Sequence, residues 1–392
     1  MERSIRGAVA IAGIGETTYY KRGQSPDPEF VLGLKAILAA CADAGIDPRE
    51  LDGFASYSND RNSPDRLAAA LGIRELKFSN MVWGGGGGGG SGAVANAAAA
   101  IAAGYADCVV VFRALAQGQF GRFGQSQFQG VVAGEAALWA PYGVLSAAQM
   151  FAMRTTRLLH EHGVPRETLR AVALASYHHA QQNPRAVMRG RPLDVEGYER
   201  SRWITEPFKL FDCCLENDGA AALVLVPAER ARDLAQKPVY LLAAAQGSEY
   251  RAGAGCHNNP DYATASFKQS APRLYAMAKL GPQDVDVVQS YENFTGGVVM
   301  SLIEHGFCSY ESAGEVLRLD NLIAPKGGLP LNTSGGNLAE CYMHGLELNV
   351  EAVRQIRGSS CNQVPGAEVA LVSSGPMVSN ATSMIAGAES LL

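Results

Sequence analysis

The chain has 392 residues, a net charge of −5 and a hydrophobic content of 47%, so it has enough apolar surface for a sizeable core in more than one structural unit. Charged residues make up 18% and the arginines are scattered, which argues against long disorder and against a nucleic-acid-binding surface. Its eight cysteines include no CxxC pair and no apolar run reaches about 18 residues, so we expect a cytoplasmic enzyme with no structural metal site and no membrane span.

The first predicted element is a strand. An apolar run follows Arg6 and ends at Gly15 and Glu16, which is typical of a buried strand rather than of a signal peptide. Residues 42–54 then predict a helix end, a proline turn and a second strand. A glycine run over 84–90 precedes a predicted helix over 91–103 and a strand over 107–112.

The same succession recurs later in the chain. Residues 276–288 match 42–54 in register, with a Pro, an acidic residue two positions on, an aliphatic residue and an Asp. A glycine-rich loop, a helix and a strand follow, over 334–336, 346–356 and 368–373. This repetition predicts a duplicated α/β unit, with an N-terminal half over 1–235 and a C-terminal half over 236–392, although chance recurrence of common α/β patterns is the alternative.

A long insert, about residues 115–211, interrupts the first half before its last predicted strand over 218–226. The insert begins rich in Gln, Gly and aromatic residues and continues with helical periodicity over 146–162 and 165–182. On an α/β scaffold, such an insert predicts a substrate-binding cap.

Four stretches of the chain resemble the thiolase superfamily, specifically the sterol-carrier-protein-type branch. They occur in the family's order over 179–186, 211–222, 289–296 and 332–345, and the resemblance covers almost the whole chain. It implies an α/β fold of duplicated βαβαβαββ halves, stacked as a five-layer αβαβα sandwich, and a homodimer.

The reactive groups of a thiolase are missing from their expected positions. The nucleophilic Cys of the family would fall near Gly87, and a second Cys would follow the strand over 368–373, but neither place holds one. Tyr291 and Tyr342 occupy the places of two family histidines. This pattern is similar to the thiolase-like aldolases of steroid side-chain breakdown (lipid-transfer-protein aldolases), whose two catalytic tyrosines match these positions.

The loss of cysteine fits a change of reaction. Cleavage of a β-ketoacyl-CoA requires a nucleophile, whereas retro-aldol cleavage of a β-hydroxyacyl-CoA requires only proton transfer and a stabilised thioester enolate. We therefore predict a carbon–carbon lyase that converts a bulky, steroid-type β-hydroxyacyl-CoA into a ketone and a short acyl-CoA such as propionyl-CoA. Tyr291 and Tyr342 would transfer the protons, with a half-buried, hydrogen-bonded aromatic as the alternative for each.

A free tyrosine is a weak base, because about 0.1% of it is ionised at pH 7. His344, two residues after Tyr342, and Glu292, beside Tyr291, are therefore predicted to tune the tyrosines or relay their protons. We count His344 among the catalytic residues on this ground.

The glycine-rich segments are predicted to help bind the substrate. Glycines at 87 and 88 would leave room for a bulky alcohol. They would also expose backbone N–H groups at a helix N-terminus, where these could face an oxyanion. A flexible linker is the alternative. A phosphate-binding loop is disfavoured, because no Gly-Lys-Ser/Thr sequence follows. The predicted substrate-binding set is Gly87, Gly88, Glu292, Asn293, Gly335 and Gly336.

The prediction includes no covalently bound cofactor, and coenzyme A enters as part of the substrate. The resemblance implies a small partner protein with an OB-fold and a zinc ribbon, which would complete the acyl-CoA channel in an α2β2 complex. Two other functions stay open: a thiolase or acyltransferase whose nucleophile lies elsewhere, and a non-catalytic acyl-CoA- or lipid-binding subunit.

Overall fold

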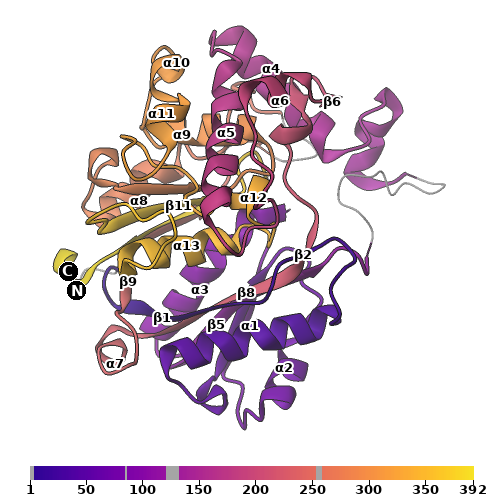
Figure 1. The fold of residues 1–392 in the computed structure, drawn as a ribbon. Coiled ribbons are helices and arrows are strands. Elements are labelled where there is room, and N and C mark those ends of the chain that lie inside the picture. Colours follow the sequence, from indigo (N-terminus) through magenta and orange to yellow (C-terminus); the bar gives the residue numbers. More distant parts are fainter. Residues whose placement is uncertain (1–3, 84–85, 121–131, 253–257) are drawn as a thin grey trace.

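The structure is a computed structural model that describes residues 4–83, 86–120, 132–252 and 258–392 (Figure 1). Its main sheet contains the strands β1 (Val9–Glu16), β2 (Tyr20–Lys21), β3 (Gly53–Tyr57), β4 (Phe78–Val82), β5 (Val109–Ala116), β8 (Asn217–Pro227), β9 (Val239–Gly247), β10 (Val287–Ser290), β11 (Val369–Ser374) and β12 (Ala381–Gly387). A separate hairpin joins β6 (Trp203–Thr205) to β7 (Phe208–Lys209). The helices are α1 (Glu29–Ala44), α2 (Pro64–Leu71), α3 (Gly90–Ala102), α4 (Ala147–Glu161), α5 (Glu167–Gln182), α6 (Val195–Arg200), α7 (Ala228–Ala231), α8 (Ser270–Ala278), α9 (Thr295–Glu304), α10 (Ala313–Val316), α11 (Leu319–Leu322), α12 (Gly336–Ala339) and α13 (Leu346–Arg357).

The order of the strands repeats within the sheet. One half runs β4-β3-β5-β8-β1 and the other runs β10-β11-β12-β9. The pairs β3–β5 and β10–β11 are parallel, whereas β5–β8 and β11–β12 are antiparallel. A parallel bridge from Val288 to Leu331 takes the place that β4 has beside β3. The predicted α/β fold of two duplicated halves is thus confirmed, while the boundary after residue 235 stays a prediction.

Helices divide the two halves into layers (Figure 1). The helices α3 and α13 form the middle layer, because each contacts strands of both halves. On the outer faces, α1 packs on β1, β5 and β8, and α8 packs on β9 and β12. The strands between these layers are buried on both faces, which is why they read as continuous apolar runs.

Close packing of α1 on β1 depends on two glycines. A Cβ at Gly13 would overlap the carbonyl oxygen of Ala40, and one at Gly15 would overlap that of Ala36. The helix ends at Gly45, whose φ of 74° is a left-handed conformation that glycine adopts without strain.

The insert folds into a helical cap. Its helix α4 begins at a capping box formed by Ser146 and Gln149, as the predicted helix start at residue 146 required. Both α4 and α5 pack on α9, and α5 also packs on α11 and α12, so the cap lies over the C-terminal half. Among the helices that the structure describes, none is long and apolar enough to cross a membrane.

Candidate active site

A cavity of about 1250 Å³ lies between the cap and the ends of three strands. Its lining includes residues that follow β3, β4 and β10, together with side chains of α4 and α5. Apolar groups from the cap, such as Met150 and Phe151, form much of the wall. The cavity also contains the two tyrosines that the sequence singled out.

The hydroxyl oxygens of Tyr291 and Tyr342 are 2.7 Å apart, although the residues are 51 positions apart in the sequence. Tyr291 follows β10, and Tyr342 follows the short helix α12. Both side chains line the cavity and are otherwise buried, with 1% and 5% of their surface exposed. The structure thus brings the predicted pair together in direct hydrogen-bond contact.

Side chains alternate along both tyrosine loops. Tyr291 and Asn293 line the cavity, whereas Glu292 between them is fully buried away from it. Tyr342 and His344 also line the cavity. Phe294 also lines it, whereas Glu292 and Met343, which lie between the lining residues of each loop, do not. Four of the predicted site residues therefore share one wall.

Burial keeps the two tyrosines and His344 neutral. It raises the pKa of Tyr291 well above the ordinary value, and the neighbouring hydroxyl of Tyr342 adds to the effect. Burial also raises the pKa of Tyr342, although the hydrogen bond from Tyr291 opposes this. Burial, with the positive charges of Arg113 and Arg61, lowers the pKa of His344 well below its ordinary value. The resting site at pH 7 therefore holds two phenols and a neutral imidazole.

Glu292 lies behind the cavity wall. Its two carboxylate oxygens accept hydrogen bonds from the backbone N–H of Asn337 (3.0 Å) and the hydroxyl of Ser176 (3.2 Å). Burial raises the pKa of Glu292 to about 7. The side chain joins the loop of Tyr291 to α12, just before Tyr342, so the structure supports a positioning role instead of the predicted substrate contact.

The glycine run packs against the tyrosines. A Cβ at Gly87 would overlap the ring of Tyr291, and one at Gly88 would meet Val378. Of the glycines that the structure describes, Gly86 lines the cavity, and Gly87 and Gly88 do not. The absence of side chains at 87 and 88 therefore makes room for other residues of the protein. The sequence had instead predicted that it makes room for the substrate.

Gly335 and Gly336 have a similar packing role. Their φ angles of 109° and 53° are left-handed conformations that favour glycine. A Cβ at Gly336 would overlap the carboxylate of Glu292, and one at Gly335 would crowd Ala180 of α5. Both glycines are buried and lie outside the described lining of the cavity, so they shape the second tyrosine loop from within.

Two residues that the sequence did not single out support the same loop. The hydroxyl of Tyr57 donates hydrogen bonds to the carbonyl oxygens of His344 (3.0 Å) and Met343 (3.3 Å). The guanidinium of Arg113 lies 5.4 Å from the ring of Tyr57 and pairs with Asp60 at 3.1 Å. Their positions after or within early strands carried no sequence signal, because the contacts are long-range.

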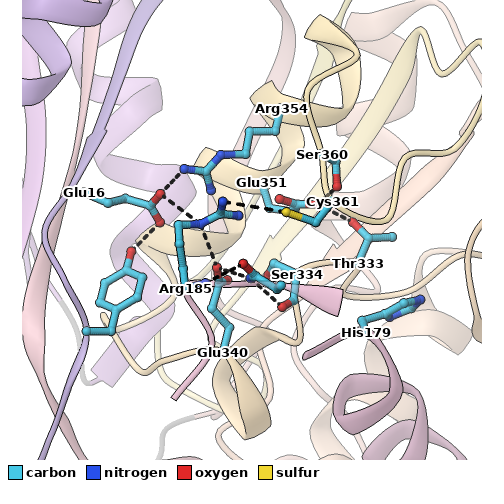
Figure 2. Close-up of polar contacts among 12 residues, drawn as sticks. Glu16, His179, Arg185, Thr333, Ser334, Glu340, Glu351, Arg354, Ser360 and Cys361 are labelled. Atoms are coloured by element: carbon cyan, nitrogen blue, oxygen red, sulfur yellow. Dashed lines mark hydrogen bonds and ion pairs between the residues drawn. The ribbon is translucent and has the colours of Figure 1, made fainter. Parts of the chain in front are cut away.

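A partly buried ionic network contacts the second tyrosine loop through Glu340 (Figure 2). Glu340 on this loop accepts a 2.7 Å hydrogen bond from Nδ2 of Asn183 and lies 3.6 Å from Nε of Arg185. Arg185 also lies 3.7 Å from Glu16, which pairs with Arg354. The family-like stretch over 179–186 thus anchors the loop rather than lining the cavity.

Cys213 and Cys214 line the cavity, which the sequence had not predicted. Burial raises the pKa of Cys213 to about 12 and that of Cys214 well above its ordinary value. Both are therefore protonated thiols, and a thiol is a much weaker nucleophile than a thiolate. Across the part of the chain that the structure describes, no cluster of His, Cys, Asp and Glu is arranged to hold a metal ion.

The sequence of the chain is similar to those of known proteins. A family model described as thiolase C-terminal domain-like matches residues 248–388. The chain is 38% identical to the 17-hydroxy-3-oxo-4-pregnene-20-carboxyl-CoA lyase of Mycobacterium tuberculosis, over 95% of this chain and 97% of that protein. It is 39% identical to the steroid side-chain-cleaving aldolase of Thermomonospora curvata, over 98% of each.

Solved structures give the same picture. The chain superposes on the Ltp2-ChsH2(DUF35) aldolase with a TM-score of 0.92 and 38% identity, covering 99% of both chains. It also superposes on human mitochondrial 3-ketoacyl-CoA thiolase with a TM-score of 0.70 and 16% identity, which shows a shared fold.

Proposed function

The chain belongs to the thiolase superfamily, in the branch that includes the steroid side-chain-cleaving aldolases, and from this premise we propose that it is a carbon–carbon lyase acting on a β-hydroxyacyl-CoA. The observation that carries the proposal is the contact between the hydroxyls of Tyr291 and Tyr342, 2.7 Å apart in the wall of a large cavity. The cysteines beside them are protonated, so the site is suited to proton transfer rather than to covalent capture.

The contact between the phenols suggests how the protons move. The active form is the minor one in which the tyrosine pair has given one proton to solvent. Its phenolate accepts the proton of the β-hydroxyl, and the Cα–Cβ bond then breaks to leave the ketone. The electron pair of that bond forms the thioester enolate, and the second tyrosine donates its proton to Cα. Proton transfer along the 2.7 Å hydrogen bond between Tyr291 and Tyr342 restores the starting state. The same hydrogen bond stabilises whichever oxygen carries the charge.

We assign His344 a supporting role in this step. Its ring lies 5.3 Å from that of Tyr342, measured between centroids, and it lines the same cavity. Because burial keeps the imidazole neutral, it can hydrogen-bond the active phenolate without adding a charge of its own.

The cavity supports a bulky substrate. Its volume of about 1250 Å³ is large beside the 300–1,000 Å³ or so of common ligand pockets. We propose a steroid-type β-hydroxyacyl-CoA that is cleaved to a ketone and a short acyl-CoA such as propionyl-CoA, in keeping with the names of the two relatives. Coenzyme A enters as part of this substrate, and the proposal needs no bound cofactor.

We also propose a homodimer that binds a small OB-fold and zinc-ribbon partner in an α2β2 complex. One of the similar solved structures, the Ltp2-ChsH2(DUF35) aldolase, is named for two components. At the cavity, Trp83 is 91% exposed and Met81 is 44% exposed, as is common where another chain binds. Met81 lies on β4, which is the last strand at one end of the sheet. We propose that a second copy of the chain binds along the outer edge of β4.

Product analysis tests the function directly. The protein is incubated with a steroid-type β-hydroxyacyl-CoA, with and without the partner, and the products are identified by mass spectrometry. We expect a ring ketone and a short acyl-CoA in equal amounts. Transfer of an acyl group to free coenzyme A would instead indicate a thiolase, and binding without turnover would indicate a carrier subunit.

A further inference from the structure

Asn293 presents one half of its amide to the backbone and the other half to the cavity. Its Oδ1 accepts a 2.9 Å hydrogen bond from the backbone N–H of Phe294. The side chain is 7% exposed and lines the cavity. Among the residues that the structure describes, none accepts a hydrogen bond from Nδ2, and this nitrogen is open to the cavity rather than sealed in the protein. A buried site thus contains a neutral N–H donor without a protein acceptor.

The orientation of this amide is determined by its neighbours. If the amide were flipped, Nδ2 would face the N–H of Phe294, and two donors cannot share a hydrogen bond. The backbone is also held, because the N–H of Cys214 donates to the carbonyl oxygen of Asn293 at 3.0 Å. Cys213 and Phe294 form an antiparallel bridge beside it. The donor is therefore preorganised.

Asn293 lies at a useful position relative to the tyrosine pair. It is two residues after Tyr291, and both side chains face the cavity. Only Glu292 separates the two residues, in the loop that follows β10. The β-hydroxyl and thioester oxygen of one substrate are separated by only a few bonds. A hydroxyl placed at the phenols therefore leaves the thioester oxygen within reach of the amide.

We propose that Nδ2 of Asn293 donates a hydrogen bond to the thioester oxygen and stabilises the enolate, which makes Asn293 a catalytic residue of the proposed lyase. When the Cα–Cβ bond breaks, its electron pair moves into the thioester and the negative charge gathers on this oxygen. The charge leaves when Cα receives its proton from the tyrosine pair. A fixed donor aimed at a developing charge is an effective form of catalysis, and a neutral amide does so without exchanging protons with the phenols.

Asn293→Asp is the sharpest test, because it removes the donor and keeps the shape of the side chain. The aspartate keeps an oxygen to accept the N–H of Phe294 and replaces the NH2 group with a second oxygen. We expect kcat to fall by about 10²- to 10³-fold, as when one oxyanion donor is lost, with KM changed only a few-fold. Asn293→Ala removes the amide donor without adding charge, and its kcat should fall by a similar factor. Asn96→Asp on α3, outside the cavity lining, is the matched control and should keep full activity.

A second readout separates enolate stabilisation from bond cleavage. The wild-type protein should exchange the Cα hydrogens of propionyl-CoA for deuterium in D2O without any ketone present, and Asn293→Asp should slow this exchange by a factor similar to that on kcat. The proposal would be overturned if Asn293→Asp and Asn293→Ala both kept wild-type rates of cleavage and of exchange. A wild-type protein that exchanges but never cleaves would sink the lyase function while leaving the donor role intact.

Discussion

Gly87 lies against the ring of Tyr291, and a Cβ at this position would overlap the ring atoms Cε2 and Cζ. The ring cannot move aside easily, because Tyr291 is 1% exposed and its hydroxyl is bonded to Tyr342. A glycine in a run that the sequence alone could assign to a linker thus holds one of the two tyrosines in place.

We predict that Gly87→Ala displaces Tyr291 and lowers kcat by about 100-fold or more, since even a 1 Å misplacement of a reacting group has an effect of that size. Steady-state kinetics would measure it, with circular dichroism to confirm folding. Gly33→Ala on α1 is the matched control, because its Cβ would lie 3.6 Å from that of Ala114, an ordinary contact. Full activity of Gly87→Ala would show that the ring position is unimportant.

Removing either phenol oxygen should disable the pair. Tyr291→Phe and Tyr342→Phe keep both rings and the shape of the cavity, and each should lower kcat by about 10²- to 10⁴-fold because one proton carrier is lost. The double variant should be little worse than the single ones, since the two groups act as a unit. Tyr275→Phe, whose hydroxyl bonds the carbonyl oxygen of His305, controls for the loss of a tyrosine hydroxyl elsewhere. Multiplicative losses in the double variant would contradict a coupled pair.

Glu292 should make the stability of the fold depend on pH. Its pKa is about 7 in the folded chain against an ordinary 4.5. Because the folded state resists ionisation, the contribution of Glu292 to stability is fully present below pH 4.5 and is lost as the pH rises to about 7, by up to about 3 kcal/mol.

Glu292→Gln cannot ionise and should remove this share of the pH dependence. Urea unfolding at pH 5 and pH 8 would show the variant gaining stability relative to wild type as the pH rises. Glu196→Gln, at an exposed position on α6, should show no such trend. A constant difference between Glu292→Gln and wild type across this range would mean that the carboxyl is already ionised at pH 5.

The cavity cysteines should be dispensable for catalysis. A Cys213→Ala/Cys214→Ala variant should keep its cleavage activity, because both thiols are protonated and neither is needed in a retro-aldol reaction. In the wild type, slow alkylation by iodoacetamide should still inhibit, since an adduct on either residue fills the cavity. The double variant should resist this inhibition. The control Cys361→Ala removes an exposed thiol outside the described cavity lining, and this variant should still be inhibited. Loss of activity in the double variant would favour the acyltransferase alternative.

Much of the architecture could be predicted because it depends on local patterns. Apolar runs indicated the buried strands, and repeated helix–turn–strand signals indicated the duplicated halves. The roles of the glycines were predicted less well. A missing Cβ shows that something lies close, but it does not show whether the neighbour is substrate or protein. At Gly87 the neighbour is Tyr291, which is distant in the sequence.

The residue types alone determined which chemical groups this protein can use: two phenols at the signature positions, with no cysteine where a thiolase nucleophile would lie. Only the tertiary structure decided which of two neighbouring side chains faces the cavity and which is buried in the protein. Glu292 is turned toward Ser176 and Asn337, while Asn293 is open to the cavity. That division follows from packing between distant segments, and burial in turn sets the protonation state of each group.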